Sequence, residues 1–192
     1  ERRTLLARVA QLDEDKLSDR NAAIATWRDV SLDQPNDAGA LHALERLYLA
    51  GEHWSELLEV LRRKVDIASS DADAIELLAR IAQFYEQRLG DSEEAITAWL
   101  EIIDRDSEDV RALNELARLY RAAERSGDLI EVLERQSMLF QGPAQTDLHI
   151  EIARLLAGPL GRSIEALDRW APVLRTDPQH PTAVAAVQAA LG

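Results

Sequence analysis

The chain has 192 residues, an apolar fraction of 46% and a formal net charge of −13. That apolar fraction is typical of a folded protein, and the excess of Asp and Glu disfavours non-specific binding to the phosphate backbone of nucleic acids. The chain has no cysteine, which excludes disulfides, thiolate metal sites and cysteine nucleophiles but leaves the compartment open. No apolar run approaches the roughly 18 residues of a membrane-spanning helix.

Helical patterns follow one another along the whole chain. Ala, Leu, Glu and Arg dominate, and apolar residues recur at spacings of three and four, as in Leu78, Ile81, Ala82 and Tyr85. These spacings predict amphipathic helices and no strands. In chain order we expect five helix pairs, at residues 2–35, 36–69, 70–106, 107–141 and 142–178, then a single helix at 182–191, all in one array over residues 1–192.

Helix-breaking residues stand between the expected helices. Gly51, Gly90 and Gly161 suit the left-handed conformation that ends the first helix of a pair. Pro35 and Pro178 are expected to end second helices, because proline disfavours the helical conformation in the residue before it.

The sequence also repeats itself at a spacing of 72 residues. The segment LARIAQ at 78–83 rewrites LARVAQ at 6–11, and Trp99 follows Trp27 at the same spacing. A shorter period of 34 to 38 residues is nested within this one and carries an apolar motif that recurs up to Trp170. Such periods predict a solenoid, in which neighbouring repeats bury a continuous core and leave an extended surface for binding.

These pairs resemble the tetratricopeptide repeat, a helix-turn-helix module. The third pair follows the family's order of large, small and aromatic positions best, with one extra residue before its glycine: Leu78, Ile81, Ala82, Tyr85, Gly90, Ala95, Trp99 and Ile102. In the second pair, Glu45 stands where a small residue is usual. The resemblance implies an all-α, right-handed α-solenoid of about five helix pairs plus a terminal helix, with Trp27, Trp99 and Trp170 in the core.

The sequence shows no recognisable catalytic or metal site. Its four histidines, His42, His53, His149 and His180, lack the spacing of paired metal ligands, and no phosphate-binding loop or nucleophile elbow occurs. We therefore expect a non-catalytic protein that holds no cofactor and no metal ion.

The resemblance directs attention to the first helices of the pairs, whose non-core face lines a concave groove in tetratricopeptide arrays. There we expect the partner-binding residues, which are polar and mostly cationic: Arg46, Arg118, Arg154, Arg111, Arg121, His42, Gln83, Gln87 and Asn114. Arginines on one side of an acidic protein would make the groove locally basic. We hypothesise a scaffold that binds a peptide or protein there, through bidentate contacts to an acidic segment or a C-terminal carboxylate.

Several alternatives stay open. The arginines can instead pair with neighbours such as Glu45 or Glu115 and serve packing and solubility. The chain, which starts at Glu1 rather than Met, is expected to belong to a longer bacterial-type multi-repeat protein, as its regulatory or self-assembly arm. Self-association would use the terminal helix, where Val184, Val187 and Leu191 lack a following helix. An RNA-processing scaffold of half-tetratricopeptide repeats is disfavoured by the acidic charge.

Overall fold

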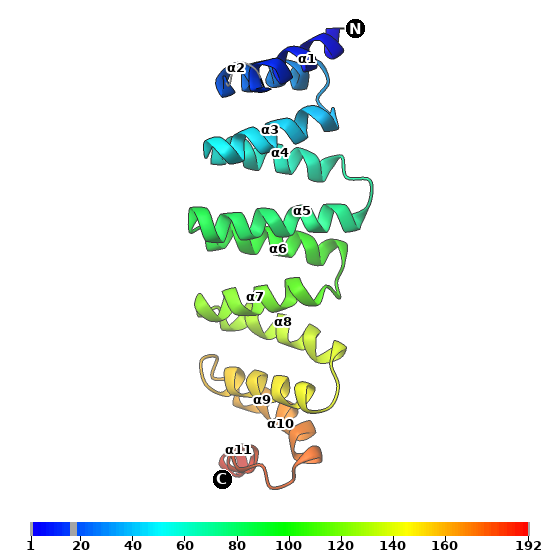
Figure 1. The fold of residues 1–192 in the computed structure, drawn as a ribbon. Coiled ribbons are helices and arrows are strands. Elements are labelled where there is room, and N and C mark those ends of the chain that lie inside the picture. Colours follow the sequence, from blue (N-terminus) through cyan, green and yellow to red (C-terminus); the bar gives the residue numbers. More distant parts are fainter. Residues whose placement is uncertain (1, 16–18, 192) are drawn as a thin grey trace. The chain divides into compact units, whose positions relative to one another are not determined.

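A computed structural model describes residues 2–15 and 19–191, with side-chain surroundings for 2–13 and 19–189. Within these ranges the structure is helical and contains no strand (Figure 1). In chain order the helices are α1 (Arg2–Asp15), α2 (Arg20–Asp33), α3 (Ala38–Gly51), α4 (Trp54–Asp66), α5 (Asp71–Phe84), the π-helix η1 (Tyr85–Leu89), α6 (Ser92–Arg105), α7 (Val110–Ala122), α8 (Ser126–Leu139), α9 (Pro143–Ala157), α10 (Ser163–Thr176) and α11 (Pro181–Leu191). The predicted fold class, all-α helix pairs followed by a terminal helix, is confirmed.

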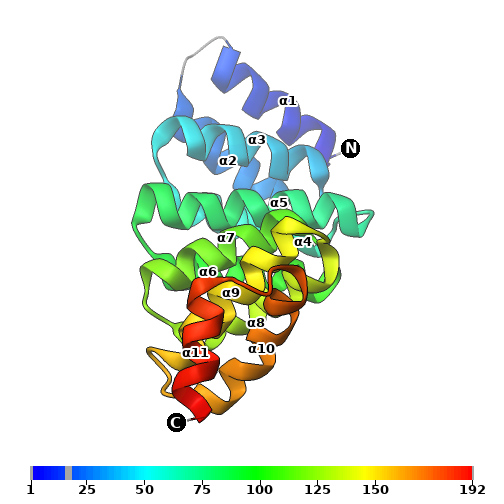
Figure 2. The ribbon, with the colours of Figure 1, turned by 90° about the horizontal axis from the view of Figure 1, so that it is seen from below.

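The helices divide into two compact units, Glu1–Gly90 and Asp91–Gly192. In the first unit, each of α1 to α4 packs against the next helix in the chain. In the second unit α6 to α11 do the same, and Figures 1 and 2 show α10 beside both α9 and α11. Consecutive helices are therefore the packing partners within each unit, as a helix-pair repeat requires. The single array over residues 1–192 stays a prediction.

Buried apolar side chains between these helices form the core of each unit. Trp99 and Trp170 are 1% and 2% exposed, which confirms their predicted place in the core. Ala82 and Ala117 are buried as well, and their small side chains allow neighbouring helices to approach closely. Trp27, which was also predicted in the core, is only half-buried, and Ala10 is the single buried side chain among those described in α1.

The ends of the first helices differ in part from the prediction. Gly90 and Gly161 have the expected left-handed backbone, with φ of 68° and 64°. Gly51 does not: it is the last residue of α3, and the left-handed residue is Glu52, with φ of 57°. The next amide, of His53, donates to the Tyr48 carbonyl at 2.9 Å, the hydrogen bond that closes a Schellman helix end. Hydrogen bonding at the helix end, rather than a glycine, therefore sets this turn.

The extra residue before Gly90 is taken up by a π-helix. The five residues of η1, Tyr85–Leu89, continue α5 directly, and the Gly90 amide donates to the Tyr85 carbonyl. A single inserted residue widens one helical turn in this way and leaves the helix before it unchanged. The second helix of the pair then starts after Asp91, whose carboxylate accepts a hydrogen bond from the Glu94 amide at 3.1 Å.

Candidate functional site

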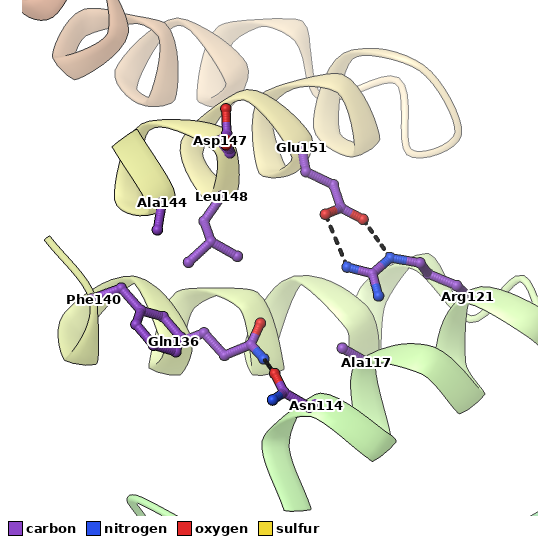
Figure 3. Close-up of a pocket in the computed structure, with 9 residues that line it drawn as sticks. All are labelled: Asn114, Ala117, Arg121, Gln136, Phe140, Ala144, Asp147, Leu148 and Glu151. Carbon is purple, nitrogen blue, oxygen red and sulfur yellow. Dashed lines mark hydrogen bonds and ion pairs between the residues drawn. The ribbon is translucent and has the colours of Figure 1, made fainter. Parts of the chain in front are cut away.

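A cavity of about 330 Å³ lies in the second unit, between α7, α8 and α9 (Figure 3). Part of its wall is apolar and part is amide or charged: Asn114, Ala117, Arg121, Gln136, Phe140, Ala144, Asp147, Leu148 and Glu151 line it. The three helices contribute both kinds of side chain: Ala117, Ala144 and Leu148 are small or apolar, whereas Asn114, Gln136 and Glu151 are polar.

An amide pair connects α7 and α8 at this cavity. The side-chain nitrogen of Gln136 donates to the side-chain oxygen of Asn114 at 2.7 Å, and Gln136 is only 4% exposed. Asn114 was among the predicted partner-binding residues, whereas Gln136 was missed. Its signal in the sequence is a polar residue on the apolar face of a helix, three residues after the fully buried Leu133. A buried amide of this kind can orient a ligand's main chain.

An ion pair connects α7 and α9 at the same cavity. Arg121 donates from Nε to Glu151 Oε1 at 2.6 Å and from Nη2 to Glu151 Oε2 at 2.9 Å, as the two dashed lines in Figure 3 show. The hydrogen bonds from Arg121 to Glu151 raise the pKa of Arg121 above its ordinary value, against the opposing effect of burial. Such a two-bond pair holds both side chains in a fixed geometry.

A second cavity of about 330 Å³ lies beyond this ion pair. It is lined by Tyr120, Arg121, Glu124, Ser126, Leu129, Glu151, Leu155 and Pro159, which belong to α7, α8, α9 and the turns after α7 and α9. Arg121 and Glu151 line both cavities. The ion pair therefore stands between the two.

The structure brings two of the nine predicted residues, Asn114 and Arg121, into one cavity. Three more lie exposed on the same helices without lining either cavity, Arg111 and Arg118 on α7 and Arg154 on α9. Arg118 donates from Nε to Glu115 at 2.8 Å, while the Arg154 side chain forms no hydrogen bond or ion pair with any described residue.

The other four predicted residues belong to the first unit. His42 and Arg46 are exposed on α3, Gln83 is exposed on α5, and Gln87 is exposed in η1. Glu45, next to Arg46, pairs with Lys64 of α4 and Arg80 of α5.

The described residues hold no group of three or more His, Asp or Glu side chains that could bind a metal ion. Over the same part of the chain, every helix is too short or too polar to span a bilayer. On the terminal helix Val184 and Val187 are half-buried, and the side chain of Leu191 lies outside the described residues.

Comparison with known proteins identifies one repeat directly. The tetratricopeptide repeat family matches residues 40–75, which comprise most of α3, all of α4 and the start of α5. No curated protein matches the chain.

Among solved structures, the chain is similar to MamA, with 20% identity, coverage of 93% of both chains and a TM-score of 0.44. It is also similar to YrrB, described as a TPR protein with an unusual peptide-binding site, with 14% identity, coverage of 95% of this chain and 90% of that one, and a TM-score of 0.42. A tetratricopeptide repeat protein from Parabacteroides merdae gives 14% identity, coverage of 96% and 70%, and a TM-score of 0.46.

Tetratricopeptide repeats typically form non-catalytic scaffolds for protein–protein interaction, and their partners are proteins or peptides. The match at residues 40–75 falls on a helix pair that the structure shows in full, and further helix pairs of the same kind precede and follow it. Residues 40–75 therefore form a tetratricopeptide repeat, and it lies within a series of helix pairs.

Proposed function

We propose that the chain is a non-catalytic scaffold whose second unit binds a peptide, or an extended segment of a partner protein, on the exposed face of α7 and α9. The observation that carries the proposal is the cavity between α7, α8 and α9. Its mixture of apolar wall and a few placed polar groups is characteristic of ligand sites. Asn114 and Arg121 connect it to the face that the sequence predicts for partner binding.

The walls of this cavity define how a partner would bind. Phe140, Ala144 and Leu148 offer an apolar surface for one side chain of the partner, and burial of such a side chain contributes about 1.5 to 3 kcal/mol. The amide pair of Asn114 and Gln136 supplies hydrogen-bonding groups for the partner's main chain.

The predicted acidic partner remains a prediction on this face. Arg154 is free to meet a carboxylate, but at an exposed position such a contact contributes only about 0.2 to 1 kcal/mol. Arg118 and Arg121 already donate to Glu115 and Glu151, so an acidic ligand would compete with those carboxylates.

Filling the cavity tests this proposal. Ala144 is exposed at the start of α9 and lines the cavity, so Ala144→Trp places a large side chain in it without disturbing the core. Ala171→Trp on α10 is the matched control, since Ala171 is also exposed and lines neither cavity.

The probe is a displayed library of random dodecapeptides selected on the wild-type chain. Affinities of the enriched peptides are then measured by fluorescence polarisation. We expect Ala144→Trp to weaken binding by about tenfold or more, which corresponds to one lost apolar anchor, and Ala171→Trp to leave it unchanged. Equal affinities for the two variants would place the binding site elsewhere on the chain.

A further inference from the structure

The two cavities that share Arg121 and Glu151 are arranged end to end along α7 and α9. On α7 the first cavity contacts Asn114 and Ala117, and the second contacts Tyr120, followed by Glu124 in the turn after α7. On α9 the same order holds, from Ala144 and Leu148 at the first cavity to Leu155 at the second. Arg121 and Glu151 stand at the shared boundary, so a ligand that enters both cavities must cross their ion pair.

The charges that line the two cavities favour a cationic ligand. Arg121 is the single Lys or Arg among the residues that line them, and both of its donors are directed to Glu151. The remaining charged residues, Asp147 and Glu124, form no hydrogen bond or ion pair through their side chains with any described residue. An anionic ligand would meet two unmatched carboxylates, whereas a lysine or arginine of the ligand would be complementary to both.

Both cavities also offer apolar surface. Phe140 and Leu148 line the first, and Tyr120, Leu129 and Leu155 line the second. With a helical rise of 1.5 Å per residue, the mean positions of the unshared lining residues of the two cavities are separated by about 7 Å along α7 and about 13 Å along α9. An extended chain covers these distances in about two to four residues.

We propose that the two cavities and the Arg121–Glu151 pair between them form one site for an extended, basic segment of a partner. The segment carries two apolar side chains about two to four residues apart, one for each cavity, and a lysine or arginine beside them that pairs with Asp147 or Glu124. Its main chain crosses the Arg121–Glu151 pair, which stays intact. This inference rests on the proposed function and names the chemistry of its partner.

The composition of the selected dodecapeptides tests the inference. We expect enriched peptides to carry two apolar residues at this spacing with Lys or Arg next to them. Replacing either apolar residue of an enriched peptide by Ala should lower its affinity about tenfold, and replacing its basic residue by Glu should lower it by about fivefold to tenfold or more. Enrichment of Asp, Glu or a free C-terminal carboxylate would overturn the inference in favour of an acidic partner.

A charge-matched pair of variants ties the basic preference to the two carboxylates. Asp147→Asn with Glu124→Gln removes both negative charges from the site, and we expect it to lower the affinity for basic peptides by about fivefold to tenfold. Asp104→Asn with Glu108→Gln removes the same charge from exposed positions that line neither cavity, and should change the affinity less than twofold. Equal losses in the two variants would mean that the net charge, not this site, attracts the peptide, and would overturn the inference.

The failure of the inference and that of the proposed function give different results. If acidic peptides are enriched and Ala144→Trp abolishes their binding, the site on α7 and α9 stands and its assigned partner chemistry is wrong. If Ala144→Trp leaves every enriched peptide bound, or if no peptide is enriched, the proposed site itself is wrong, and the inference is overturned with it.

Discussion

Glu45 accepts a hydrogen bond from the Nζ of Lys64 at 2.6 Å, and only 8% of Glu45 is exposed. Its other carboxylate oxygen is paired with Arg80. The three residues come from α3, α4 and α5, so one buried carboxylate connects three consecutive helices of the first unit. A charge occupies the position where the family usually has a small residue, and it is tolerated because two cations compensate it.

Glu45→Gln is expected to destabilise the first unit by about 1 to 3 kcal/mol at pH 7, because it leaves Lys64 and Arg80 without their shared partner. Arg80 contributes the smaller part of this loss, because its side chain is 49% exposed and solvent screens its charge. Urea unfolding followed by circular dichroism measures the loss. Glu59→Gln, at an exposed position of α4, should have no comparable effect.

The same residue predicts a pH dependence. Burial raises the pKa of Glu45, but the hydrogen bonds and charges of Lys64 and Arg80 outweigh burial and hold that pKa below its ordinary value. The pair therefore stabilises the fold fully above the unfolded-state pKa of about 4.3, and this contribution is lost as the pH falls through the lower folded-state pKa. The difference in unfolding free energy between wild type and Glu45→Gln should shrink in acid. A constant difference from pH 7 into acid would contradict the assigned role of the charge.

Trp99→Ala should cost about 3 to 5 kcal/mol of unfolding free energy, since the side chain is 1% exposed and its removal leaves a large cavity in the second unit. Thermal melting followed by circular dichroism provides the measurement. Trp54→Ala is the comparison, because Trp54 is only half-buried beside Phe84, with ring centroids 5.2 Å apart. Similar losses of stability for both variants would show that Trp99 contributes no more to the core than the half-buried Trp54.

Glycine at the two left-handed non-glycine positions should stabilise the chain. Glu52 and Glu124 have φ of 57° and 56°, a conformation that costs an ordinary residue about 1 to 2 kcal/mol. Because glycine also loses more backbone entropy on folding, we expect Glu52→Gly or Glu124→Gly to add about 0.5 to 1 kcal/mol each. Gly90→Ala is the reverse experiment: no atom lies within 4 Å of an added Cβ, so a loss in unfolding free energy there would reflect the backbone alone.

Deletion of Gln87 should be tolerated, because it removes one residue from the five-residue π-helix and allows an ordinary α-helical turn in its place. We expect the unfolding free energy to change by less than about 1 kcal/mol. Deletion of Thr97, exposed in the regular helix α6, should unfold the second unit, since it rotates Trp99 and Ile102 away from the core. Equal effects of the two deletions would mean that η1 does not absorb the extra residue.

The helices and much of the core followed from the sequence because they depend on local periodicity. Apolar residues three and four apart define the buried face of a helix wherever that helix packs, so Trp99 and Trp170 were recognised as core residues. The helix ends were harder to predict. Glu52 adopts a conformation that glycine prefers, because the hydrogen bond from His53 to Tyr48 stabilises the turn.

The candidate site was predictable only in part. Asn114 and Arg121 were identified from their place on a first helix, whereas Gln136 and Leu148 enter the cavity from α8 and α9, by the packing of those helices. Composition and repeat period determined the helical repeat architecture, because they are summed over many residues. Only the tertiary structure decided that Arg121 pairs with Glu151, a residue 30 positions away, because pairing between distant side chains depends on how their helices pack. That contact also decides which charged side chains remain without a partner among the described residues.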